Sequence, residues 1–197
     1  MSNVSRQSSL AAALFALAAL AAGANVPMCL NEWLPSPSHE KLGTALQAAE
    51  IAAMLIEFQN GPVDSAAIYD ARCGLGNYSP LFNPLTYKPH KAYYAFMAFN
   101  ELRKRGTAVG VLRDDPCPGV YSAAARGADG SVAAMLANTG AEETPFSLHV
   151  AGNTPTPGAA AVPPRWRCRI VDNTRTWDET PLPAAMPPRS IILLANS

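Results

Sequence analysis

Two short apolar runs with a helical segment between them constrain the fold of this chain more than any other feature. Residues 28–33 read Met-Cys-Leu-Asn-Glu-Trp, and a second run, 66–69, reads Ala-Ala-Ile-Tyr. Each has the length of a buried strand and is flanked by Pro, Gly or Asp. A strand, a helix and another strand in succession form a parallel pair with a right-handed crossover. We therefore expect the first half of the chain to be α/β.

The helices are predicted from apolar residues that recur three and four positions apart. Residues 39–59 carry such residues on two sides, which predicts a mostly buried helix that Asn-Gly-Pro at 60–62 ends. A further helix is expected over 88–105, with Pro89 in its first turn and Gly106 as its C-cap.

Polar side chains stand at the end of both predicted strands. Asn31 and Glu32 close the first strand, and Asp70 follows the second. Because the carboxyl ends of parallel strands meet at one edge of a sheet, functional groups gather there in α/β proteins. A solvated charge that merely ends a strand is the simpler interpretation. Both interpretations stay open on the residues alone.

From residue 107 onward, short β-type runs replace the helices. They cover 108–112, 119–125, 131–137, 144–150, 167–171 and 190–194. Strands at a spacing of roughly ten residues predict a small antiparallel β-sandwich. We therefore expect an α/β part over 1–106 and a β-sandwich domain over 107–197.

Residues 1–24 fit two different structures. The run 10–22 is uncharged, and Ala22-Gly23-Ala24 has the form of a signal-peptidase site, which would make the protein secreted or periplasmic. Ala and Leu are also the best helix formers and Gly23 suits a C-cap, so the same residues fit a helix before the first strand. The run is too short to span a bilayer, and we expect no membrane partner.

Composition excludes several classes of function. The 15 basic residues balance the 15 acidic ones without a basic stripe, so no nucleic-acid partner is expected. No two of Cys29, Cys73, Cys117 and Cys168 have C-x-x-C spacing, so no metal site or cofactor is expected, and disulfide pairing stays open. A Ser or Cys hydrolase is disfavoured because G-x-S-x-G is absent and the three histidines are scattered.

Four motifs occur in a fixed order along the chain. They are Leu-Asn-Glu-Trp at 30–33, Gln-Asn-Gly at 59–61, Tyr-Asp-Ala-Arg at 69–72 and a helix from 88 that contains Tyr-Tyr-Ala-Phe. With the β-rich part that follows, they resemble the C-terminal part of a clan A glycoside hydrolase, closest to family 39, over residues 28–197. The resemblance implies the last two strands of a (β/α)8 barrel with their helices, followed by a β-sandwich.

The resemblance also implies a retaining mechanism on an oligosaccharide or glycoside, without a cofactor. Glu32 matches the nucleophile at the end of barrel strand seven, which acts opposite an acid/base carboxylate about 5 Å away. By the same resemblance, Asn31, Trp33, Tyr69 and Asp70 border the sugar subsite.

The acid/base Glu of that family lies on strand four, upstream of every residue matched here. Asn100-Glu101 has the right letters but falls on the last predicted helix. The resemblance therefore implies a fragment that is inactive alone, whose open sheet edge the missing barrel portion or another chain covers. The alternative is a secreted, non-enzymatic module that binds carbohydrate or protein through Trp166 or Trp177.

Overall fold

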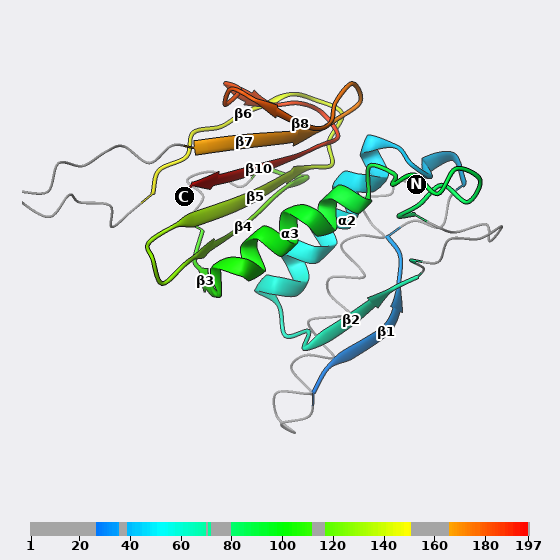
Figure 1. Ribbon diagram of the computed structural model, residues 1–197, viewed down its shortest axis with the longest axis horizontal. Coiled ribbons are helices and arrows are strands. Elements are labelled where there is room, and N and C mark those ends of the chain that lie inside the picture. The colour runs from blue at the N-terminus through cyan, green and yellow to red at the C-terminus, as the bar shows by residue number, and fades with distance from the viewer. Residues whose placement is uncertain are drawn as a thin grey trace, which may run out of the picture.

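The chain forms three layers, which Figure 1 shows from the side. In the computed structural model, the residues described are 27–35, 39–69, 71, 80–111, 117–150 and 166–196. A parallel pair of strands forms one layer, two helices the next, and a six-stranded antiparallel sheet the third. The predictions on 1–24, Asp70 and Cys73 lie outside the described residues.

The parallel pair consists of β1 (Cys29–Trp33) and β2 (Ser65–Ile68). At its start, the Met28 amide donates to Asp64 Oδ2 (2.7 Å), and the Met28 carbonyl accepts from the Asp64 amide (2.9 Å). At its end, the Tyr69 amide donates to the Trp33 carbonyl (2.9 Å). The predicted strand–helix–strand unit is thus confirmed. Within the described residues no third strand joins this pair, so the sheet is not closed.

The connecting helix begins later than its apolar pattern predicts. A 3-10 turn, η1 (His39–Lys41), precedes α2 (Ala45–Asn60). Gly43 between them has a φ of +76°, and Thr44 caps the helix by accepting a hydrogen bond on Oγ1 from the Gln47 amide (3.2 Å). The predicted burial of this helix is confirmed, since eleven of the sixteen residues of α2 are buried.

The last helix, α3 (Tyr93–Arg105), begins five residues after the predicted start at 88. Pro89 does not open the helix but forms a bridge to Phe82. The prediction was wrong because proline fits an extended strand edge as well as a first helical turn. The predicted C-cap is confirmed, because Gly106 has a φ of +88° and its amide donates to the Arg103 carbonyl (3.1 Å).

The antiparallel sheet has the order β3-β4-β5-β10-β7-β8. Its strands are β3 (Thr107–Val109), β4 (Val120–Arg126), β5 (Val132–Asn138), β7 (Trp166–Val171), β8 (Thr176–Thr180) and β10 (Ser190–Asn196). The central strands β5 and β10 are buried along their whole length, since both faces of the sheet are covered. Helices α2 and α3 cover one face over β4, β5 and β10 (Figure 1).

In the described residues, the second sheet of the predicted sandwich consists of only two short strands of two residues each. It consists of β6 (Thr144–Pro145) and β9 (Ala185–Met186), and the expected strand over 144–150 ends at Pro145 because proline lacks an amide to donate. Phe146, Leu148 and Met186 still close a small outer core over Ile170, Ile192 and other residues of the large sheet. A partial barrel plus a sandwich is therefore not confirmed.

One apolar cluster joins the three layers. It includes Trp33 of β1, Ile51 of α2, Ala98 of α3 and Met135 and Ile191 of the large sheet. The cluster crosses the boundary predicted at 106–107, and the division into two domains stays a prediction.

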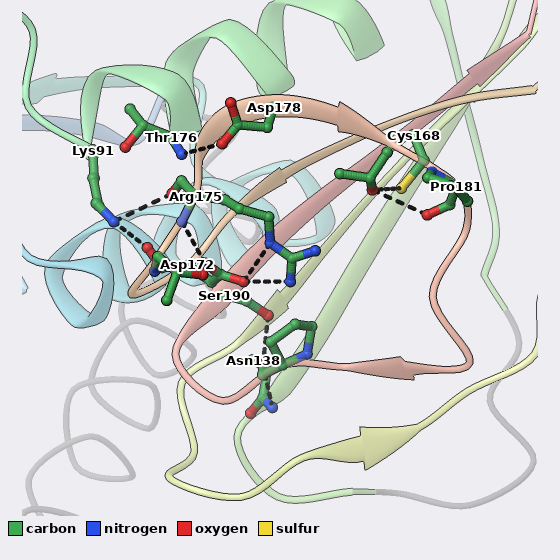
Figure 2. Close-up of polar contacts among 12 residues, drawn as sticks. Lys91, Asn138, Cys168, Asp172, Arg175, Thr176, Asp178, Pro181 and Ser190 are labelled. Atoms are coloured by element: carbon green, nitrogen blue, oxygen red, sulfur yellow. Dashed lines mark hydrogen bonds and ion pairs between the residues drawn. The ribbon is translucent and has the colours of Figure 1, made fainter.

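A polar contact ties α3 to the β7–β8 hairpin (Figure 2). Lys91 Nζ, just before the helix, donates to the backbone carbonyls of Asp172 and, at 3.2 Å, of Arg175. The Asp172 carboxylate is buried and accepts hydrogen bonds from Thr174 and from the Arg175 guanidinium (2.5 and 2.8 Å). Burial alone would raise the pKa of Asp172, but these hydrogen bonds outweigh it and lower the pKa to about 2.

Candidate active site at the end of strand β1

Strand β1 contains one residue more than its partner at the position of the candidate nucleophile. Leu30 pairs with Ala66 and Trp33 pairs with Ile68, so two residues of β1, Asn31 and Glu32, stand opposite one residue of β2. This is a β-bulge, a feature that is common at barrel rims and beside active sites, where it redirects side chains.

The bulge decides which side chains face the helices. In a regular strand Leu30 and Trp33, three positions apart, would point to opposite faces. With one extra residue between them, both pack against the helix-facing core. Asn31 and Glu32 are left exposed, near the carboxyl end of the strand. In the described part of the chain nothing hydrogen bonds or pairs with the Glu32 carboxylate.

Trp33, predicted to border a sugar subsite, lies in the core with 7% of its surface exposed. Its ring meets Phe58 of α2 edge-on at 5.0 Å between centroids and lies 6.4 Å from Phe96 of α3. The indole nitrogen is buried and has no partner among the described residues. The observed contacts of Trp33 are therefore those of a packing residue.

Tyr69 is the predicted subsite residue that the structure places beside the end of β1. It follows β2 directly, is 38% exposed, and its amide holds the Trp33 carbonyl at 2.9 Å. The structure thus brings the ends of both strands together, with Glu32 on one and Tyr69 after the other. Asp70, the next candidate, is outside the described residues, and the sugar-binding roles stay predictions.

Buried polar groups hold the segment just before α2 against the first turns of the helix. Lys41 Nζ pairs with Glu50 Oε1 at 2.7 Å, and Gln47 Oε1 accepts from the Gly43 amide at 3.0 Å. His90 packs on Gly43, and burial lowers the pKa of its imidazole. These contacts fix the backbone at the start of α2.

Metal-binding clusters and membrane-spanning helices are both absent from the ranges that the structure describes. There, no group of three His, Cys, Asp or Glu side chains is placed to bind a metal ion, and Cys29, Cys117 and Cys168 are free thiols. No helix in these ranges has the length and apolar content needed to cross a membrane. Glu101 pairs with Lys104 on α3 at 2.6 Å, as expected for a residue outside the strand-end site.

Sequence reasoning missed the bulge, although a signal for it is present. Leu30 and Trp33 are both large and apolar at an odd spacing, which a regular half-exposed strand cannot bury on one face. It also missed β8, whose residues Thr176–Thr180 are largely polar because they form an exposed edge strand.

No protein-family model and no curated protein matches the sequence. Solved structures match by fold. A glycoside hydrolase family 30 subfamily 8 xylanase from Clostridium acetobutylicum superposes with a TM-score of 0.64 at 15% identity, covering 90% of this chain and 44% of that one. A family 30 endoxylanase from Clostridium papyrosolvens gives 0.63 at 13% identity, covering 88% and 42%. A glucosidase from Croceicoccus marinus gives 0.61 at 15% identity, covering 87% and 46%.

These likenesses concern the fold. The chain has mostly β-sheet with two helices and is similar to the C-terminal part of glycoside hydrolase domains, while it spans less than half the length of the matched structures. The closer resemblance to family 39 is not confirmed, since the family named in these matches is family 30.

Proposed function

We propose that this chain supplies the nucleophile side of a retaining glycoside hydrolase site, with a glycoside or an oligosaccharide as substrate. One observation carries the proposal. The bulge at Asn31 and Glu32 exposes a carboxylate at the carboxyl end of a parallel strand, in a fold similar to part of glycoside hydrolases. In barrels of this kind, catalytic groups occupy the carboxyl ends of the strands.

The chemistry follows the two-step displacement of retaining enzymes. The Glu32 carboxylate attacks the anomeric carbon and forms an ester bond as the bond to the leaving oxygen breaks, while an acid donates a proton to that oxygen. The same acid, now a base, takes a proton from water, whose oxygen displaces Glu32 and restores the carboxylate. Asn31, Tyr69 and Asp70 border the sugar in this proposal.

Trp33 has a different role in the proposal. Its buried ring, held against Phe58, supports a positioning role in which it fixes β1 on the helices and so aims Glu32. It does not touch the sugar.

The acid/base group comes from outside the matched strands. The parallel pair itself supports this dependence, because Cys29, Asn31 and Glu32 of β1 and Ser65, Ala66 and Ala67 of β2 are all exposed. Parallel sheets are otherwise buried on both faces. We therefore expect the isolated chain to be inactive until further barrel strands complete the sheet.

A chimera tests both parts. In it, residues 27–196 replace the segment of the Clostridium acetobutylicum xylanase on which they superpose, so that the xylanase supplies the missing strands and acid. We expect no hydrolysis of dinitrophenyl glycosides by the 197-residue chain alone and measurable hydrolysis by the chimera. Glu32→Gln should lower the rate of the chimera by about 10³-fold or more.

The matched control is Glu57→Gln, an exposed carboxylate on α2, which should leave the rate of the chimera unchanged. A folded chimera that hydrolyses equally well with Glu32→Gln would refute Glu32 as the nucleophile. If the isolated chain hydrolyses the substrate and Glu32→Gln abolishes this hydrolysis, only the need for further strands is refuted.

A further inference from the structure

A pocket separate from the strand-end site lies between α3 and the helix-facing side of β7, β8 and β10. It has a volume of about 230 Å³ and is lined by Met97, Glu101, Arg167, Arg169, Trp177, Leu193 and Ala195. We refer to it as the α3–β7 pocket. It lies at the margin of the helix layer, because α2 and α3 pack mainly over β4, β5 and β10, and the start of α3 reaches β8 through Tyr94 and Trp177.

The strand pattern places two arginines in this pocket. Cys168 and Ile170 of β7 belong to the outer core, so the alternate residues Arg167 and Arg169 face the helix side. Their neighbours on β10 are Ala195 and Leu193, respectively, which form an apolar floor with Met97 of α3.

The two arginines differ in their availability. Arg169 Nη2 pairs with Glu179 at 3.2 Å, Nη1 donates to the Trp177 carbonyl at 3.3 Å, and its guanidinium lies 5.7 Å from the centre of the Trp177 ring. The nearby Glu101 carboxylate pairs with Lys104. Arg167 is exposed, and within the described residues no hydrogen bond or ion pair engages it. Among the described residues that line the pocket, Arg167 is therefore the one uncommitted cation.

Trp177 forms an aromatic wall in an unusual backbone conformation. It is the extra residue of a bulge, since Ile170 pairs with Asp178 and Val171 with Thr176, and its φ is +64°. Such strained positions for a bulky residue tend to occur at functional sites. The ring stacks on Tyr94 of α3, with centroids 5.6 Å apart and planes 21° apart, which fixes its orientation.

We propose that the α3–β7 pocket is a second carbohydrate-binding site that takes a single hexuronate residue of a glycan. Arg167 would bind the carboxylate, and the apolar floor with the edge of the Trp177 ring would contact the C–H face of the sugar ring. The volume is below the roughly 300–1,000 Å³ of pockets for drug-sized ligands, so it suits one sugar residue. The assignment of the ligand as a sugar rests on the proposed function, whereas its negative charge is inferred from Arg167.

The test is a binding titration of the full chain followed by NMR, with the indole N–H signal of Trp177 as reporter. The ligands are methyl glucuronide, methyl glucoside and cyclohexanecarboxylate. We expect the glucuronide to shift the Trp177 signal and to bind about tenfold or more tightly than either of the others, since the first competitor lacks the charge and the second the hydroxyls.

Variants locate the site. Arg167→Gln should weaken glucuronide binding about tenfold or more, Arg167→Lys should retain part of it, and Arg103→Gln, an exposed arginine of α3, should not change it. An unchanged NMR spectrum outside the pocket shows that each variant is folded.

Three results would overturn the proposal: no binding of the glucuronide, equal binding of methyl glucoside, or unchanged binding by folded Arg167→Gln. Equal binding of cyclohexanecarboxylate would overturn the assignment of a sugar. The Glu32→Gln variant should bind the glucuronide as tightly as the unchanged chain does. Loss of glucuronide binding would therefore count against this pocket, and loss of the Glu32 dependence of hydrolysis against the proposed catalytic site.

Discussion

Glu32 and Trp33 show how one extra residue can give adjacent side chains different tasks. The bulge buries the indole of Trp33 between the strand and the helices and leaves the carboxylate of Glu32 exposed. In the proposed function, the aromatic packing of Trp33 holds the backbone of β1 and so sets the direction of Glu32. Residue identity alone would have assigned both side chains to a sugar site.

Replacing Trp33 tests its assignment as a packing residue. Trp33→Ala should reduce the free energy of unfolding by about 3–5 kcal/mol, because a large buried side chain is lost. Trp33→Phe should reduce the free energy of unfolding by less. It keeps an aromatic ring at this position and removes an indole N–H that has no partner among the described residues. Urea unfolding measures both values. A loss below about 1 kcal/mol for Trp33→Ala would contradict burial of the ring.

Asp172 predicts a pH dependence of stability. Its pKa is lowered to about 2 in the folded chain from an ordinary value of 3.8, so its stabilising contribution is present above about pH 4 and is lost as the pH falls toward 2. Asp172→Asn should therefore cost about 1.5–3 kcal/mol at neutral pH and progressively less below pH 4.

Urea unfolding of both proteins between pH 7 and pH 2 checks this prediction. Asp178→Asn, an exposed carboxylate on the same hairpin, is the control and should cost less at neutral pH. A difference between Asp172→Asn and the unchanged chain that does not vary with pH would contradict the lowered pKa.

At the scale of elements, α3 is held at its start by a lysine rather than by a conventional cap. Thr44 caps α2, but the N-cap position of α3 is Ala92, which offers no side-chain oxygen. Lys91 instead reaches the carbonyls of the β7–β8 hairpin (Figure 2). Burial lowers the pKa of this lysine, while Asp172 and Asp178 oppose the shift. The contact joins segments 81 residues apart.

Removing that ammonium should loosen the hairpin from the helix. We expect Lys91→Met to lower the free energy of unfolding by about 1–3 kcal/mol, because two hairpin carbonyls lose a charged donor. Lys88→Met changes an exposed lysine just upstream and should cost less than about 0.5 kcal/mol. Equal costs for the two substitutions, measured by urea unfolding, would contradict the role of Lys91.

The elements that were predicted well are those in which apolar residues recur at the regular spacing of a helix or occupy a continuous buried strand. The buried face of α2 and the central strands β5 and β10 fall within a few residues of their expected places. The start of α2 was missed because its cap, Thr44, lies inside the apolar pattern. The start of α3 was missed because Pro89 fits an extended edge as well as a first helical turn. The bulge at Glu32 was missed because it depends on the pairing between strands.

At the scale of the whole molecule, the six-stranded sheet and the parallel pair differ in how completely their faces are covered. The large sheet has helices on one face and the β6–β9 layer on the other, whereas β1 and β2 are covered on the helix side and exposed on the opposite side. The exposed side of β1 and β2 is the one opposite the helices, and the chain spans less than half of the glycoside hydrolase structures similar to it in fold. In the proposed function, further barrel strands meet β1 and β2 there.

Hydrogen exchange can measure that difference in coverage. Amides of β1 and β2 should exchange at least about tenfold faster than those of β5 and β10, which corresponds to about 1.4 kcal/mol in the free energy of opening. NMR or mass spectrometry resolves the four strands. Equal protection would mean that the parallel pair opens only with the whole molecule.

The most direct test of the central claim is nucleophile rescue in the chimera with the Clostridium acetobutylicum xylanase. Glu32→Gly removes the carboxylate and leaves space for a small anion, so turnover of a dinitrophenyl β-glycoside should fall by about 10³-fold or more. Sodium azide should restore turnover, and the product should be the α-glycosyl azide, because azide attacks from the side that Glu32 occupied. A folded Glu32→Gly chimera that keeps its activity, or that forms no α-azide, would contradict Glu32 as the nucleophile.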